Sequence, residues 1–227
     1  MLRAEPRGFE VRVRSVQVHD APVERAEAGQ RVAVSLPGVE RTAVRRGDVL
    51  VEPGAYPVSY RLDVVLEATA EVPAQVTVHH GTVAVSARVA RVGERWAQLR
   101  LAAPVVAARG DRVVLRTFTT VGGGRVLDPA PPRHSDPARF ERLERGDVAG
   151  IVHAPVRLSA LRHLLDGEPP GLERAGEWIF SRSWLEELRA DLHARLAAAD
   201  PLDPGLPPPA APWARDVLPL LGVELRG

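Results

Sequence analysis

The stretch Gly110-Asp111-Arg112-Val113-Val114-Leu115-Arg116 decides the fold class, because a Gly-Asp turn leads directly into a short valine-rich run. The same unit, a turn followed by a strand-like run, recurs through the first 128 residues. Short turns, most of them containing glycine, separate the other strand candidates, which lie at residues 31–36, 49–51, 62–68, 76–79, 83–89 and 96–101. Many short strands at this spacing indicate antiparallel barrels or sandwiches rather than a parallel sheet.

Two places in this half depart from simple alternation. The apolar register slips near Ser15, which predicts a β-bulge at that position. The run Gly122-Gly123-Gly124 precedes another strand-like run and has no lysine after it, so it lacks the features of a phosphate-binding loop. We expect these glycines to let two backbones approach closely.

Beyond residue 128 the apolar spacing becomes helical. Asp136-Pro137 predicts a helix start, with an N-cap followed by proline at the first helical position. Ser183 and Glu186 form a capping box before a helix whose leucines, including Leu196, face inward. Other expected elements are a helix over residues 155–166, a strand over 177–180, a proline-rich connector over 201–212 and a last helix over 212–221. This order of elements is typical of a winged-helix module.

The charge is unevenly distributed along the chain. The total is 30 basic residues, all arginine, against 29 acidic ones. Residues 55–128 carry 9 arginines against 6 acidic residues, whereas residues 129–227 carry 12 arginines against 15 acidic residues. An RNA partner would therefore favour the first of these segments, since an acidic module is a poor phosphate binder.

Composition excludes several classes of function. With no cysteine, the chain has no disulfide, thiolate zinc site or thiol nucleophile. No run of about 18 apolar residues is long enough to span a bilayer, and the N-terminus lacks the apolar stretch of a signal peptide. We therefore expect no membrane association and a cytoplasmic location.

Candidate chemistry is sparse. No nucleophile elbow, zinc-protease helix or plausible carboxylate pair is present, so we expect no catalytic residue in this chain. His79 and His80 are adjacent on a predicted strand and point to opposite faces, so they cannot readily share a metal. We expect no metal site, and one of the two histidines to pack beneath the turn at Gly81.

Arg31 is the most interesting single position. In the alternating run of residues 31–36 it shares a face with Ala33 and Ser35, which leaves room around the guanidinium for an anion. An ion-paired or solvated surface arginine fits the same pattern. The residues alone leave both interpretations open.

Several segments resemble the bacterial selenocysteine-specific elongation factors, which are specialised relatives of elongation factor Tu. Ala28-Gly29-Gln30-Arg31-Val32-Ala33, followed by Arg46-Gly47-Asp48, is shared widely by the second domain of translational GTPases. The more specific matches are residues 79–82, 98–104, 110–116 and above all Thr120-Val121-Gly122-Gly123-Gly124-Arg125-Val126-Leu127-Asp128-Pro129. The resemblance covers nearly the whole chain.

The resemblance implies a multidomain fold with two antiparallel β-barrels, like the second and third domains of elongation factors, followed by a mainly α winged-helix region. Residues 1–54 would form an incomplete second-domain barrel and residues 55–132 the third-domain barrel. Residues 133–180 would form one winged-helix module and residues 181–227 the start of another. The GTPase domain and the distal winged helices of the family are missing from this chain.

The resemblance also implies a function: delivery of selenocysteyl-tRNA to the ribosome at UGA codons in a GTP-dependent way. It places Arg31 in the pocket for the aminoacyl group, and candidate tRNA contacts are His79, His80 and Arg116. GTP and Mg would bind in the missing GTPase domain, so this chain would hold no cofactor and would not itself be an enzyme. The selenoprotein mRNA hairpin would be bound only by the missing C-terminal modules.

Three other interpretations remain open at this point. The chain could work in trans with a separately encoded nucleotide domain. It could be a winged-helix DNA-binding regulator with a β sensor domain. It could also be a truncated, non-functional product.

Overall fold

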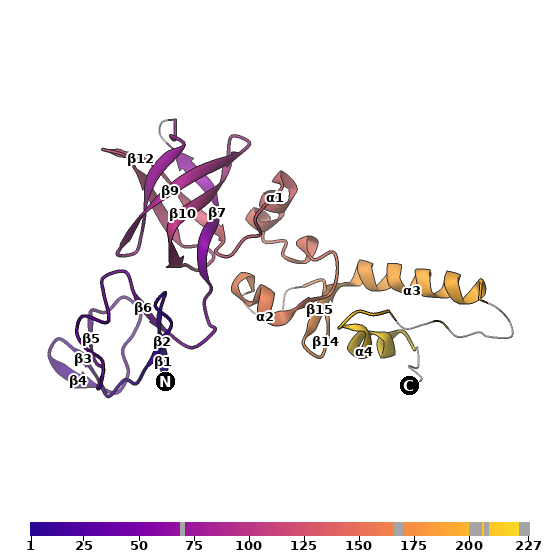
Figure 1. The fold of residues 1–227 in the computed structure, drawn as a ribbon, viewed down its shortest axis with the longest axis horizontal. Helices are drawn as coiled ribbons and strands as arrows, with labels where there is room; N and C mark the ends of the chain where they lie inside the picture. The colour runs from indigo at the N-terminus through magenta and orange to yellow at the C-terminus, as the bar shows by residue number, and fades with distance from the viewer. Residues whose placement is uncertain (69–70, 166–169, 200–205, 207–208, 223–227) are drawn as a thin grey trace. The chain divides into compact units, whose positions relative to one another are not determined.

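The computed structural model describes residues 1–68, 71–165, 170–199, 206 and 209–222. These residues form two compact units, residues 1–140 and 141–227, and Figure 1 colours them along the chain. In the described part of the chain, no helix is both long enough and apolar enough to cross a bilayer.

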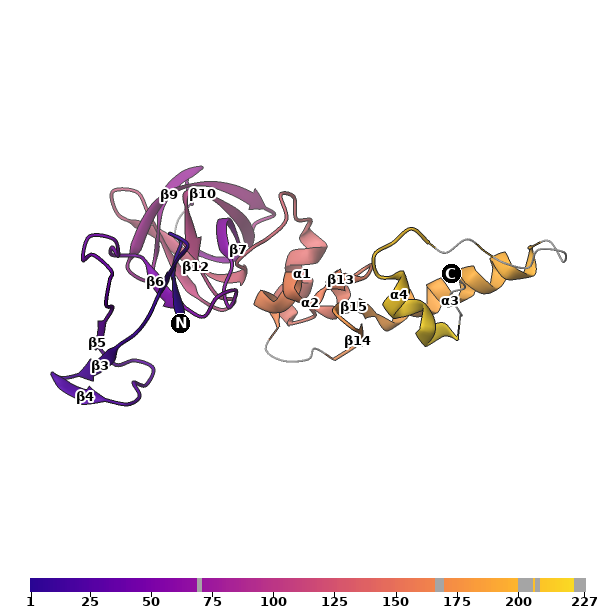
Figure 2. The ribbon, with the colours of Figure 1, turned by 60° about the horizontal axis from the view of Figure 1, so that its bottom comes forward.

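The first unit contains a closed six-stranded barrel, seen end-on in part in Figure 2. Its strands pair antiparallel in the order β10-β7-β12-β11-β8-β9. They are β7 (Val58–Ala68), β8 (Gln75–His80), β9 (Val83–Val92), β10 (Trp96–Val106), β11 (Arg112–Arg116) and β12 (Thr120–Asp128). Inward valines and leucines from every strand fill the interior, so the prediction of a barrel in this segment is confirmed.

Gly123 and Gly124 of β12 have the role that the sequence predicts for the glycine run. A Cβ atom on Gly123 would lie 2.8 Å from the carbonyl oxygen of Val113 in β11. One on Gly124 would lie 2.5 Å from the carbonyl oxygen of Val65 in β7. Because real Cβ atoms do not approach so closely, only glycine lets β12 lie against both neighbours here.

Residues 1–54 form two small sheets instead of a closed barrel. One has the order β2-β1-β6 and the other β4-β3-β5. The strands are β1 (Leu2–Glu5), β2 (Phe9–Val11), β3 (Ser15–Val18), β4 (Ala21–Val23), β5 (Val32–Ser35) and β6 (Val49–Val51). Only Ala4, Glu5 and Val11 are buried, so this segment has almost no core of its own.

The predicted bulge near Ser15 is wrong. β2 ends at Val11 and β3 begins at Ser15, and the two strands belong to different sheets. The slip in apolar register therefore marks the end of one strand and the start of another. A bulge and a strand break change the side-chain register in the same way, so the pattern alone does not distinguish them.

The C-terminal elements begin with α1 (Pro137–Arg145), which starts where Asp136-Pro137 predicts. The Asp136 carboxylate accepts a hydrogen bond from the Arg139 amide at 2.7 Å, as an N-cap does. The later elements are η1 (Ala149–Ile151), β13 (Val156–Arg157), α2 (Leu158–Leu161), η2 (Arg162–Leu164), β14 (Leu172–Ala175), β15 (Trp178–Ser181), α3 (Arg182–Ala197), α4 (Ala214–Val217) and η3 (Leu218–Leu221).

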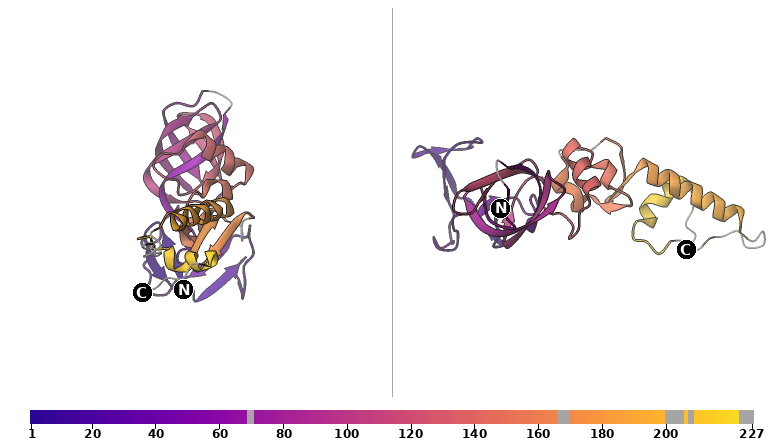
Figure 3. Two further views of the ribbon diagram at one scale, coloured as in Figure 1. Left: turned by 90° about the vertical axis from the view of Figure 1, so that its right-hand side faces the viewer. Right: turned by 90° about the horizontal axis from the view of Figure 1, so that it is seen from above.

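In the second unit a three-stranded sheet of order β13-β15-β14 leads into α3, the longest described helix (Figure 3). Phe180 of β15 packs on Trp184 of α3 with ring centroids 5.5 Å apart. Trp184 in turn meets Trp213 edge-on at 5.0 Å. This aromatic cluster packs with Val217 in one of the hydrophobic clusters of the unit, and a second contains Leu192, Ala214 and Leu218.

Several predicted helix limits need correction. The helix expected over 155–166 is a short strand followed by single turns of helix, β13, α2 and η2. Helix α3 begins at Arg182 rather than after Ser183, because Ser181 is the N-cap and accepts from the Trp184 amide at 3.2 Å. Leu196 is 44% exposed and does not face a core. The proline-rich connector lies largely outside the described residues.

A buried polar cluster fastens the chain that follows β12 to the barrel. Asp63 of β7 and Asp128 of β12 are both fully buried. Asp63 accepts hydrogen bonds from Ser135 Oγ at 2.6 Å and from Gln98 Nε2 at 3.0 Å. Arg139 pairs with Asp128 at 2.5 Å. Burial raises the pKa of Asp63 from 3.8 to about 6, because the charged form is poorly solvated there, and these hydrogen bonds offset only part of the rise.

We expect Gly124→Ala to destabilise the barrel by about 1–3 kcal/mol, because the new methyl group would force β12 away from β7. Urea unfolding followed by circular dichroism measures the change. Thr119→Ala, at an exposed turn position, is the control and should change stability by less than about 0.5 kcal/mol. Equal destabilisation by the two variants would contradict the close-approach argument.

Asp63 predicts a pH dependence of stability. Its pKa is higher in the folded protein than in the unfolded chain, so the folded state holds its proton more tightly. The corresponding stability is fully present below pH 3.8 and is lost as the pH rises through about 6, a loss on the order of 3 kcal/mol. Asp63→Asn removes this titration.

Thermal unfolding at a series of pH values between 4 and 8 tests this expectation. The free energy of unfolding of the wild type, relative to that of Asp63→Asn, should fall as the pH rises to about 6 and should level off above that value. Parallel curves for the two proteins would show that Asp63 does not titrate in this way.

Candidate functional site: an arginine-lined groove

Three arginines lie directly opposite one another across the outer face of the barrel. Arg100 of β10 is paired in register with Arg61 of β7 on one side and with Arg88 of β9 on the other. We call these three residues the arginine row. Neighbouring strands lie about 4.8 Å apart, and like charges directly opposite each other are destabilising.

No ion pair to this row is seen among the described residues. Within the described ranges, the side chains of Arg61, Arg88 and Arg100 form no ion pair with a carboxylate. Arg88 and Arg100 are also exposed to solvent. An uncompensated row of guanidinium groups is therefore a ready site for an anion, because each group presents several N–H donors in a planar fork.

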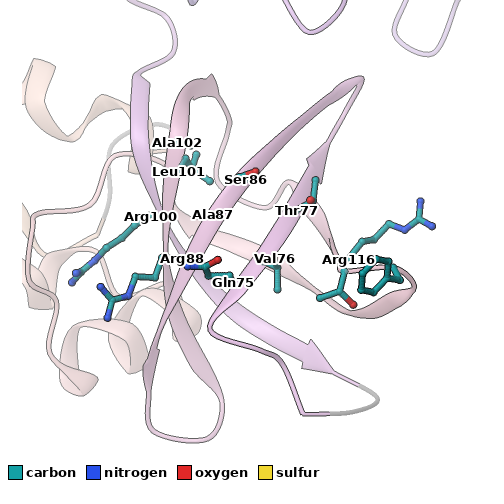
Figure 4. A pocket seen from close by; sticks show the side chains of 12 residues that line it. Gln75, Val76, Thr77, Ser86, Ala87, Arg88, Arg100, Leu101, Ala102 and Arg116 are labelled. Carbon is teal, nitrogen blue, oxygen red and sulfur yellow. The ribbon is translucent and has the colours of Figure 1, made fainter.

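A hollow lies beside the row. Arg116 of β11 is opposite Thr77 of β8, and Thr77 is opposite Ser86 of β9, so the next row carries mainly small side chains. These residues line a groove with a volume of about 600 Å³ (Figure 4). In the figure Arg88 and Arg100 lie together on one side, and Arg116 lies at the other. The small residues thus leave the space of the groove, and the arginines on either side of them supply its charge.

An aromatic residue completes the groove. Phe118, in the turn after β11, lines the groove and its side chain is fully exposed at 100%. The exposed ring offers a flat apolar surface on which a base or sugar can stack. Arginines that meet phosphates, combined with an aromatic ring that meets a base or sugar, are a common combination in RNA-binding surfaces.

One of the arginines is held by a buried side chain on the same outer face of β10. Arg100 Nε donates to Gln98 Oε1 at 3.3 Å, and Gln98 is only 3% exposed. This bond orients the guanidinium through one of its five N–H groups and leaves four for a ligand. Bidentate hydrogen bonding to a phosphate is the interaction that this geometry favours most.

Of the candidate tRNA contacts, the structure brings only Arg116 to the groove. His79 and His80 do not line it. His80 Nε2 instead lies 2.8 Å from Asp111 Oδ2, with most of the ring covered. His80 is thus held by Asp111, and the expectation that one histidine packs beneath the turn at Gly81 stays a prediction.

Arg31 is exposed and lies just before β5, which begins at Val32. The expectation that the strand includes Arg31 is therefore wrong by one residue. In the part of the chain that the structure describes, Arg31 forms no ion pair, and it does not line the groove. An exposed Arg31 without an ion pair fits a solvated surface arginine as well as an anion site, so its place in an aminoacyl pocket stays a prediction.

Sequence reasoning missed Arg61, Arg88, Arg100 and Phe118 as a group. Each arginine occupies a polar position in an alternating strand, which is the ordinary place for a solvated residue. The signal that unites them is the strand register, and register between distant strands is not readable from one sequence.

The described residues contain no group of three or more His, Asp or Glu side chains placed to hold a metal ion. Nor does the groove contain an acidic side chain among its lining residues. Its chemistry is that of a cationic surface for a bound anion.

Comparisons with known proteins agree with this architecture. Residues 59–133 match the family described as "Selenocysteine-specific elongation factor, beta-barrel domain". The chain is 33% identical to the selenocysteine-specific elongation factor of Desulfomicrobium baculatum over 87% of its own length and 36% of that protein. It is 32% identical to the Escherichia coli factor over 54% of its length and 21% of that protein.

A solved structure extends the agreement to the fold. The crystal structure of a bacterial selenocysteine-specific elongation factor EF-Sec superposes with a TM-score of 0.72 at 22% identity, covering 87% of this chain and 36% of that one. The chain thus spans about a third of the length of the relative from Desulfomicrobium baculatum. Residues 59–133 are therefore a β-barrel domain of the selenocysteine-specific elongation factor family, and the chain resembles members of that family over most of its length.

Proposed function

We propose that this chain is the tRNA-facing part of a selenocysteine-specific elongation factor. The family match of the barrel and the identity over 87% of the chain support this proposal. In this interpretation residues 1–54 belong to the second-domain barrel and residues 55–132 form the third-domain barrel. The order α1, β13, α2, β14, β15 supports a winged helix over residues 133–180, followed by the start of another over 181–227.

The arginine-lined groove binds the phosphate backbone of selenocysteyl-tRNA. The single observation that carries this assignment is the uncompensated row of Arg61, Arg100 and Arg88 beside the hollow that ends at Arg116. Contacts of this kind supply affinity and position rather than base specificity. Selection of the selenocysteyl form therefore depends on another site.

Arg31 is our candidate for that selection. A selenol is ionised near neutral pH, and a fixed guanidinium favours the anion over a neutral hydroxyl. The exposed position of Arg31, without an ion-pair partner among the described residues, supports its availability for such a contact. His79 and His80 remain weaker candidates for tRNA contact, because His80 already bonds to Asp111.

Other activities of the family belong to segments that this chain does not match. GTP with Mg would bind to a GTPase domain, the ribosome would contact the assembled factor, and the mRNA hairpin would be bound by distal winged helices. A cytoplasmic location follows from that role. The alternative of a DNA-binding regulator receives no support from the relatives, all of which are elongation factors.

Loss of groove arginines should weaken tRNA binding and its dependence on salt. We expect Arg88→Ala and Arg116→Ala each to lower the affinity for tRNA by about tenfold and to reduce the slope of log affinity against log salt by about 0.7–0.9. Fluorescence anisotropy with labelled tRNA measures both quantities. Arg189→Ala, on exposed helix α3, is the matched control. An equal loss in the control would contradict the assignment of the groove.

Arg31→Ala should reduce discrimination between aminoacyl groups. The test uses a chimera in which the Desulfomicrobium baculatum factor supplies the remaining domains. We expect the substitution to weaken binding of selenocysteyl-tRNA by about tenfold while seryl-tRNA changes little, because only the selenol carries charge. Equal losses for both forms would exclude the selenolate role.

A further inference from the structure

Gln98 connects the groove to the buried polar cluster on the outer face of the barrel. Its Oε1 atom accepts from Arg100 Nε at 3.3 Å on the groove side. Its Nε2 atom donates to Asp63 Oδ1 at 3.0 Å and to the Pro132 carbonyl oxygen at 3.1 Å. The Gln98 amide makes these three hydrogen bonds in a single side-chain conformation, so a change in one of them affects the other two.

The far side of this network is the segment that follows β12. We call residues 130–140 the linker segment. Beyond the Pro132 contact, Ser135 Oγ donates to Asp63 at 2.6 Å, and Arg139 pairs with the fully buried Asp128 at 2.5 Å. The ring of Phe140 stacks on Trp96 of β10 with centroids 5.9 Å apart. The linker segment is thus held to the barrel by buried polar contacts and one aromatic contact.

We propose that occupation of the groove by an RNA phosphate is transmitted from Arg100 through Gln98 to the linker segment. This inference rests on the proposed function of the groove. A phosphate bound to Arg100 restricts its guanidinium, and the guanidinium restricts Gln98 through the shared hydrogen bond. A more strongly held Gln98 amide in turn strengthens its contacts with Asp63 and Pro132.

Arg100 is distinguished from the other groove arginines by this connection. In the described part of the chain, the side chains of Arg88 and Arg116 make no hydrogen bond to the protein. They contribute charge to the groove but have no hydrogen-bonded connection to Gln98 or the linker segment among the described residues. The coupling is therefore assigned to one arginine, and removal of either of the others should leave it intact.

Coupling between two sites is reciprocal. If bound RNA tightens the linker segment, loosening the linker segment must weaken RNA binding by the same factor. Gln98 acts in this scheme as a positioning residue. It orients Arg100 through the hydrogen bond from Arg100 Nε to Gln98 Oε1 and does not touch the ligand. The scheme predicts effects on two measurable quantities, the protection of the linker segment from hydrogen exchange and the affinity for RNA. Both effects depend on Gln98.

Hydrogen–deuterium exchange of the linker segment tests the proposal on the full 227-residue chain. The probe is a transcript of selenocysteine tRNA at saturating concentration, and an unrelated RNA hairpin of equal length shows whether any RNA backbone suffices. We expect tRNA to slow exchange of the linker peptide about fivefold or more in the wild type. Arg88→Ala, tested at its own saturating concentration, should show the same slowing.

Arg100→Ala and Gln98→Met should bind tRNA more weakly and show no slowing of linker exchange at saturation. Arg100 is exposed, so its variant keeps the test valid if Gln98→Met fails to fold. Equal slowing in Arg100→Ala and Arg88→Ala would overturn the coupling while leaving the groove assignment intact. Failure of the wild type to bind tRNA in the groove would instead refute the proposed function.

A double-mutant cycle gives an independent measurement. Ser135→Ala removes a linker contact with Asp63 and should lower tRNA affinity in the wild type about fivefold. The same substitution should have no effect on affinity in the Arg100→Ala background. Additive losses in the two backgrounds would exclude transmission through Arg100. A matched control, Ser183→Ala on helix α3, should leave affinity unchanged in both.

Discussion

The close approach of β12 to β7 and β11 is the constraint on which the barrel depends. Gly123 and Gly124 leave space for the carbonyl oxygens of the neighbouring strands, and this space allows the six strands to close. Closure also sets the register between strands that are far apart in sequence. The arginine row exists only because that register places Arg61, Arg100 and Arg88 opposite one another.

The barrel domain carries two features that are unfavourable for stability when considered alone. One is the row of uncompensated arginines on the outer face, and the other is the pair of carboxylates buried against the linker segment. Such unfavourable features are expected at functional sites, where a bound partner compensates for them. Here members of both features are bonded to the same residue, Gln98.

The predictions from sequence succeeded where the determinants are local. Asp136-Pro137 marked the start of α1, and the glycine run marked the close approach in β12, since capping and backbone space depend on adjacent residues. The predictions from sequence failed where two local patterns compete. Ser181 rather than Ser183 caps α3 because β15 ends at Ser181 and the helix begins directly after it, and the slip at Ser15 is a strand break because the flanking strands join different sheets. Those outcomes depend on strand pairing.

Sequence alone determined the strand-rich character of the first 128 residues, the change to helical spacing after them, and the family resemblance of the motifs around Thr120–Asp128. Only the tertiary structure decided which arginines lie together, which histidine is bonded to Asp111, and how the linker segment is attached. The physical reason is the same in each case. Alternation specifies the face of a strand that a side chain occupies, whereas its neighbours on that face are set by pairing between distant strands.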